Sequence, residues 1–169
     1  MKKRSVVTGI AVLLMLILAT TAFAAPTAAK EPLPFKGSIQ SVENVVFEPP
    51  ATLHIDADGS GNATHLGRYA VTYHIEVDDS TGEGVGSLTF VAANGDSIFA
   101  DGLGQGNPSE VPGVNRIVER YTITGGTGRF AGATGSFTVE RLLTMESGVS
   151  SGRFDGKIVI PQRNRMMAS

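Results

Sequence analysis

The stretch that decides the fold is ITGGTGRFAGATGSF, residues 123–137. Its glycine spacing is close to that of a loop that holds the pyrophosphate of a dinucleotide, a site that requires a strand, then glycines, then the N-terminus of a helix. Here residues 136–143 begin with strict alternation of β-forming residues, which predicts a strand. The dinucleotide interpretation is therefore rejected in favour of a compact corner between two strands. The predicted structural turn consists of Gly125, Gly126, Gly128, Phe130 and Gly132, with Phe130 as its hydrophobic plug.

Around this corner, apolar and polar residues alternate with the period of two that is typical of half-buried strands. The clearest case is residues 68–78, and residues 86–102 predict a hairpin in which Asn94-Gly95 forms a type I′ turn. Eight strands are expected, with no convincing helix, which favours a sandwich or a closed barrel. The further strands are predicted at residues 35–40, 51–56, 114–124, 136–145 and 152–160.

The pattern of the N-terminal sequence predicts that the protein is exported. A basic segment, an apolar run over residues 10–19 and the pattern Ala22-Phe23-Ala24 match a cleavable signal peptide. The apolar run is much shorter than the roughly 20 residues needed to span a bilayer. We therefore expect residues 1–24 to be a signal peptide and the protein to be secreted, extracellular or periplasmic, without membrane attachment after cleavage. The expected order continues with a flexible linker at 25–34, a barrel domain at 35–162 and a C-terminal tail at 163–169.

Composition excludes several classes of function. Loss of residues 1–24 removes three basic residues and no acids, so the formal charge falls from −2 to −5. An acidic domain without basic clusters is a poor binder of nucleic acid. The absence of cysteine excludes disulfides, thiol catalysis and thiolate metal sites. Barrel closure, which removes exposed strand edges, suits an exported protein without disulfides.

Three motifs carry a family resemblance. The run 124–135 resembles the glycine turn of plant dirigent proteins and allene oxide cyclases, and it is most similar to that of bacterial secreted allene-oxide-cyclase-barrel-like proteins. The segments THLGR at 64–68 and ANGD at 93–96 extend the resemblance, which covers about residues 35 to 160. It implies an all-β fold, an eight-stranded antiparallel β-barrel that is calycin-like. It also implies a homo-oligomer, a trimer as in the plant relatives, which guide coupling or cyclisation of small apolar molecules. No catalytic motif is found to carry over.

Parity along the strands identifies polar side chains that are expected to face the barrel interior. Glu119 and Arg141 lie on the apolar faces of consecutive strands, and a buried charge is costly unless it is paired. We therefore expect these two residues to form an interior ion pair, as a structural element or as a polar anchor for a ligand. The ligand-binding candidates in the barrel interior are His65, Tyr69, Tyr73, Asp101, Glu119, Tyr121 and Arg141.

No metal or cofactor site is predicted. The segment DADGSGN, residues 56–62, has the early oxygen ligands of a calcium loop, but Gly67 occupies the position of the bidentate glutamate. His54 and His65 conflict in strand parity as a zinc pair. The segment is therefore expected to be an ordinary polar turn, and the expected cofactor content is none.

Three functions remain open. The leading hypothesis is a secreted barrel that binds a small apolar molecule in its interior. The second is a barrel isomerase or cyclase that uses Glu119, Tyr69, Tyr73 or Tyr121, and the third is a solidly packed structural or interaction barrel. An open cavity lined by tyrosines favours the first two, whereas a filled interior favours the third.

Overall fold

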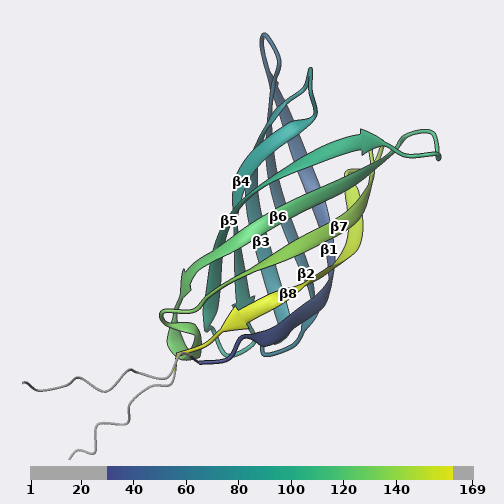
Figure 1. The fold of residues 1–169 in the computed structure, drawn as a ribbon. Helices are drawn as coiled ribbons and strands as arrows, with labels where there is room; N and C mark the ends of the chain where they lie inside the picture. Colours follow the sequence, from purple (N-terminus) through teal and green to yellow (C-terminus); the bar gives the residue numbers. More distant parts are fainter. Residues whose placement is uncertain (1–29, 162–169) are drawn as a thin grey trace, which may run out of the picture.

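The computed structural model describes residues 30–161, which form one closed barrel of eight antiparallel strands (Figure 1). Each strand pairs with its neighbours in the chain, and β1 pairs with β8 to close the ring. The expected all-β barrel is confirmed. The strands are β1 (Leu33–Glu48), β2 (Thr52–Ala63), β3 (Gly67–Asp78), β4 (Glu83–Ala92), β5 (Ser97–Pro108), β6 (Val114–Gly126), β7 (Thr134–Thr144) and β8 (Val149–Val159).

The predicted signal peptide, residues 25–29 of the predicted linker, residue 162 of the predicted barrel domain and the C-terminal tail lie outside the described residues. Within residues 30–161, no helix is long and apolar enough to cross a membrane.

The up-and-down topology gives the barrel two different ends. We call the end with the turns at 49–51, 79–82, 109–113 and 145–148 the mouth, and the opposite end the base. The base carries the turn between β2 and β3, the turn between β4 and β5, and the glycine corner. Both ends of the described chain also lie at the base, as Figure 1 shows.

The base is filled by aromatic side chains. Phe35 lies at the centre of this cluster, with its ring centroid 4.9 Å from that of Phe154 and 5.3 Å from that of Phe137. Phe90 packs against Tyr69 edge to face at 4.9 Å. Phe35 and Phe90 are completely inaccessible to solvent. Interlocked rings of this kind exclude water from the lower half of the barrel.

The glycine corner closes the base as predicted. Gly128–Phe130 forms a single 3-10 turn, and Phe130 is completely buried. Gly128 has a φ of +55°, a conformation that L residues rarely adopt, and a Cβ there would collide with the carboxylate of Asp96. That carboxylate also accepts a hydrogen bond from the Arg129 backbone N–H at 3.2 Å. The segment after the glycines is strand β7, as predicted, and not the helix that a dinucleotide loop requires.

Two local predictions are wrong. Residues 56–62 are not a polar turn but part of β2. The glycines suit the strand here, since Gly61 faces inward directly opposite Tyr69 and leaves room for the tyrosine ring. The hairpin at Asn94-Gly95 is not a two-residue type I′ turn. Only Gly95 has a positive φ, and the Ala92 N–H donates to the Asp96 carbonyl across a three-residue loop, which is the arrangement of a type I turn followed by a glycine bulge.

Candidate functional site

The upper half of the barrel interior contains a cavity of about 350 Å³ that opens at the mouth. Its walls are mainly aliphatic, and its polar lining at depth comes from three of the residues predicted from the sequence. The aliphatic lining includes Leu53, Ile55, Ile75, Val77, Ile117 and Leu143, and the three predicted residues are Glu119, Tyr121 and Arg141. A cavity of this size lies at the lower end of the range for small-molecule sites.

Glycines on two neighbouring strands line one wall of the cavity. Gly84 and Gly86 of β4, with Gly102, Gly104 and Gly106 of β5, all line it. At most of these glycines a neighbouring strand already occupies the space that a Cβ would need. At Gly102, for example, a Cβ would lie 2.5 Å from the Tyr121 ring. At Gly106 a Cβ would meet only Ile117, at 3.8 Å, which is ordinary van der Waals contact. A larger side chain at Gly106 would therefore enter the cavity without disturbing the backbone.

The expected interior ion pair forms at the depth of the cavity. Arg141 donates from Nε to Glu119 Oε2 and from Nη2 to Glu119 Oε1, both at 3.0 Å. The strand register explains the geometry, because Arg141 lies opposite Ile117 and Glu119 opposite Val139, which places the two side chains diagonally on one face. This two-point contact is the strongest arrangement for guanidinium and carboxylate.

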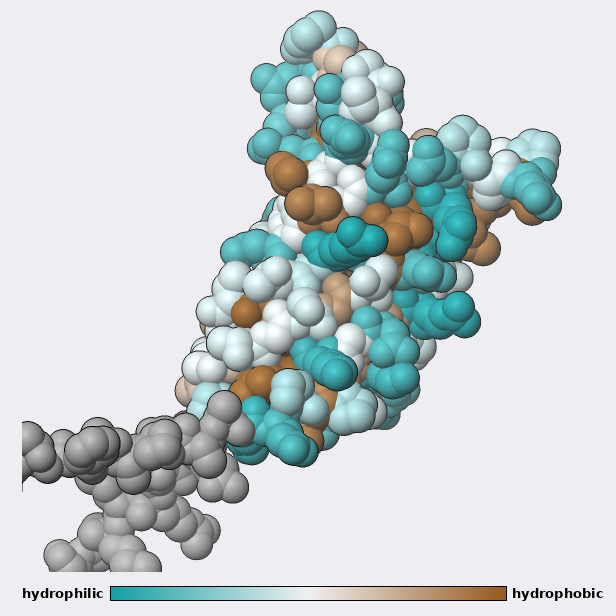
Figure 2. Space-filling model, viewed as in Figure 1, coloured by the Kyte–Doolittle hydropathy of each residue, from teal (hydrophilic) through white to brown (hydrophobic). Residues whose placement is uncertain are grey.

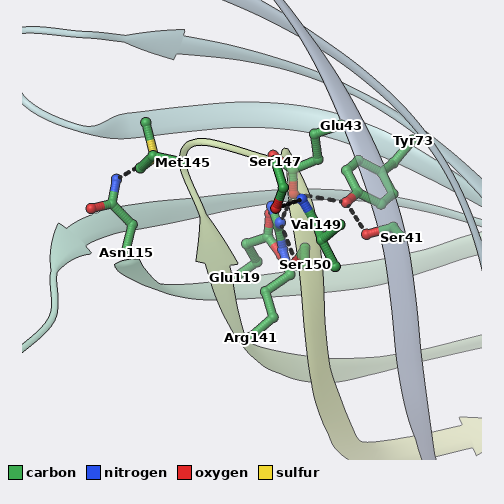
Figure 3. A network of polar contacts seen from close by, with 10 residues as sticks. All are labelled: Ser41, Glu43, Tyr73, Asn115, Glu119, Arg141, Met145, Ser147, Val149 and Ser150. Atoms are coloured by element: carbon green, nitrogen blue, oxygen red, sulfur yellow. Dashed lines mark hydrogen bonds and ion pairs between the residues drawn. The ribbon is translucent and has the colours of Figure 1, made fainter. Parts of the chain in front are cut away.

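A second carboxylate, which the sequence reasoning missed, completes the cluster. Glu43 of β1 contacts Arg141 Nη1 through Oε1, and it accepts a hydrogen bond from the Tyr73 hydroxyl at 3.0 Å (Figure 3). The side chains of Glu43, Glu119 and Arg141 are 0%, 7% and 2% exposed. Glu43 Oε2 is buried without a hydrogen-bond partner. The cluster thus sets two buried carboxyl groups against one guanidinium.

Neutral side chains support the cluster. Arg141 Nη1 also donates to Ser150 Oγ at 3.0 Å, and its guanidinium lies 5.2 Å from the centre of the Tyr73 ring. Ser41 Oγ and the Tyr73 hydroxyl are 2.6 Å apart. Burial alone would lower the pKa of Arg141, but the hydrogen bonds and charge of Glu119 outweigh it and raise that pKa. The guanidinium is therefore a permanent cation.

The three tyrosines hold their protons. Burial raises the pKa of Tyr69 and of Tyr73, and it raises the pKa of Tyr121 together with the nearby charge of Glu119. They differ in place, since only Tyr121 lines the cavity. Tyr73 lies within the ionic cluster, and Tyr69 donates to the Ser38 carbonyl at 2.6 Å among the aromatic residues of the base.

Two of the candidates do not face the interior. His65 is exposed in the turn between β2 and β3, where its φ of +66° breaks the parity used to predict its direction. Asp101 is exposed on β5, because its neighbours of the same parity, Phe99 and Leu103, are themselves on the outer surface. The inward positions of that strand belong to small residues such as Ala100 and Gly102.

Other hollows on the described surface are weaker candidates for a functional site. A hollow of about 1000 Å³ lies over the outer faces of β3 to β6, but none of the predicted site residues lines it. Within residues 30–161, no cluster of three or more histidine or acidic side chains has the geometry to hold a metal ion. The mouth cavity with its ionic cluster is therefore the candidate site.

Comparison with known proteins agrees with this architecture. The structure superposes on that of a pterocarpan synthase dirigent protein with a TM-score of 0.59, covering 82% of this chain and 96% of the other at 14% sequence identity. The fold is a dirigent-like barrel. No protein-family model and no curated protein sequence matches the chain. At this level of identity the similarity to the dirigent protein establishes the barrel fold and not an activity.

Proposed function

We propose that the protein is an exported dirigent-like barrel that binds a small, largely apolar molecule in the cavity at its mouth. The observation that carries this proposal is the division of the interior. Aromatic rings fill the base, whereas the upper half of the interior keeps a cavity of about 350 Å³ that opens at the mouth. A barrel that served only as a packed scaffold would be expected to fill this space as well, because protein interiors are normally close-packed.

The lining supports an apolar ligand with one polar group. Aliphatic side chains surround the upper part of the cavity, while Glu119, Tyr121 and Arg141 offer hydrogen-bonding groups at its depth. Such a combination of apolar walls and a few fixed polar groups is typical of small-molecule sites.

A catalytic role is the second candidate, because the dirigent protein with the similar fold is named a synthase. The chemistry of the cluster favours binding instead. Both oxygens of Glu119 accept hydrogen bonds from Arg141, and the raised pKa of Tyr121 keeps its phenol protonated and weakly acidic. A general acid or base needs a proton that it can exchange near the working pH.

Occupation of the cavity is tested with a neutral fluorophore, N-phenyl-1-naphthylamine, titrated into the purified barrel. The wild type is expected to give saturable fluorescence enhancement. Gly106→Leu is expected to abolish it, since the new side chain enters the cavity without a backbone collision. Asp101→Leu adds a leucine to the outer face of the same strand and should leave binding unchanged.

Equal binding by the wild type and Gly106→Leu, with both variants folded by circular dichroism, would show that the fluorophore binds elsewhere. The proposal would then fail. Mass spectrometry of small molecules extracted from the native protein would identify the natural ligand.

A further inference from the structure

The charges around the cavity point to a more specific ligand. We infer that the cavity takes a monocationic amphiphile, a molecule with an apolar body and one ammonium or amidinium group. This inference rests on the proposed function, because it specifies the ligand of the same site.

The first support is the imbalance within the buried cluster. Arg141 is the single cation among the cluster residues, and it is shared between Glu119 and Glu43. Glu119 uses both oxygens for Arg141, and Glu43 Oε2 has no hydrogen-bond partner. The cluster therefore sets two carboxyl groups against one guanidinium in surroundings from which water is largely excluded. A cation placed beside this excess of carboxyl groups interacts with it much more strongly there than it would at the surface.

The second support is the place from which a ligand can reach the cluster. Glu119 lines the cavity, whereas Glu43 lies behind Arg141 and does not. A carboxylate has about four lone-pair sites, so Glu119 can accept from a ligand while it keeps both bonds to Arg141. An ammonium group at the depth of the cavity would therefore contact Glu119, with its apolar body between the aliphatic and glycine walls.

The third support is the charge at the mouth. The described turns at the mouth and the strand ends beside them contain acidic residues and no lysine, arginine or histidine. The nearest basic side chain, His54 on the outward face of β2, lies 2.6 Å from Glu48, and Arg116 and Arg120 are on the outward face of β6. A low-dielectric cavity with a rim of one sign concentrates ions of the opposite sign. The acidic residues at the mouth are Glu48, Asp78, Asp79, Glu83, Glu110 and Glu146.

The same charges disfavour an anionic ligand. A carboxylate that entered past the acidic rim would meet Glu119, and Arg141 is already committed to Glu119, Glu43 and Ser150. A neutral molecule of the same shape would gain the apolar contacts and lack the ionic one. A comparison of ligands that differ only in charge therefore tests the inference more directly than a comparison of ligands that differ in shape.

Isothermal titration calorimetry with decylamine, decanol and decanoate, each below its micelle concentration and near neutral pH, separates these cases. The three probes share one alkyl chain and differ in the charge of the head group. Decylamine, which is protonated under these conditions, is expected to bind roughly 10-fold more tightly than decanol, because one charge-assisted hydrogen bond is worth about that factor. Decanoate should bind most weakly.

Glu43→Gln removes one of the two carboxyl groups that share the charge of Arg141, without altering the cavity lining. It should reduce the preference for decylamine over decanol to near unity while decanol binding stays the same. Gly106→Leu should weaken all three probes and so shows that binding is inside the barrel.

Equal affinity for decylamine and decanol in the wild type, or tighter binding of decanoate, would overturn the inference and leave the proposed function standing. A preference for decylamine that persists in Glu43→Gln would also overturn it, since the attraction would not come from the cluster. Failure of all three probes and of the neutral fluorophore to bind would reject the proposed function itself.

Discussion

Replacement of Arg141 by methionine is the perturbation that tests the ionic cluster most severely. Methionine keeps the length and removes the charge, so both Glu43 and Glu119 lose their cation inside the barrel. Breaking a buried pair by removing one partner costs about 3–5 kcal/mol. With two carboxyl groups affected, we expect a loss near 5 kcal/mol in the free energy of unfolding. A single domain has only about 5–15 kcal/mol in total, so this variant should be close to unfolding.

The two glutamines should behave differently from Arg141→Met and from each other. Glu119→Gln loses the two-point contact but leaves Glu43 to balance the guanidinium, which predicts a loss of about 2–3 kcal/mol. Glu43→Gln leaves the Glu119–Arg141 pair intact, and the new amide oxygen can still accept from the Tyr73 hydroxyl. Its effect should lie within about 1 kcal/mol of zero.

The assay is urea unfolding, followed by tyrosine fluorescence and by circular dichroism. The protein has three tyrosines and no tryptophan, and all three tyrosines are buried, so their emission reports the interior directly. In the double variant Glu119→Gln, Arg141→Met, one stranded carboxyl group is gone, and the loss should be smaller than the sum of the single losses. Additive losses, or a loss for Glu43→Gln as large as that for Arg141→Met, would refute this account of the cluster.

Three further predictions concern the corner, the tyrosines and the N-terminus. Gly128→Ala should lower the free energy of unfolding in urea by about 1–3 kcal/mol, and by more than Gly67→Ala does. Both glycines have a positive φ, but only at Gly128 would the new Cβ collide with a carboxylate. NAD(P)H should not shift the melting temperature of the wild type, and a saturable shift would restore the dinucleotide interpretation. The raised pKa values of the tyrosines stabilise the fold below the unfolded value of 10.0, so stability should fall as pH rises above it, and tyrosinate absorbance should appear only with unfolding. Intact-mass measurement of exported protein should give a chain that begins at Ala25, and a full-length chain in the membrane fraction would contradict cleavage.

Much of the fold could be predicted because alternation and turn residues are local signals. Phe137 and Val139 mark their inward face clearly, and this parity placed Glu119 and Arg141 inside the barrel correctly. Asp101 was assigned to the wrong face because large apolar residues at Phe99 and Leu103 lie on the outside. Parity identifies two faces of a strand, and only packing decides which of them is buried.

Glu43 shows a different limit. The alternation that begins at Phe35 continues through Ser41 and Glu43, so the inward position could have been found by extending the strand. Apolar residues on both faces at 45–47 hid the pattern. Its contact with Arg141 joins the first strand to the seventh, a relation that no local spacing records.

The pairing of β1 with β8 has a consequence for how the barrel folds. Seven of the eight strand pairs join segments that are neighbours in the chain and can form as hairpins, whereas this pair joins the first strand to the last. Closing so long a loop is costly in chain entropy and slows folding. Linking the base-side ends and cutting the chain at 109–113 would turn β1 and β8 into a local hairpin. The pairing of β5 with β6 would then join the two ends of the chain and become the slow step of folding. The folded barrel and its cavity would stay the same.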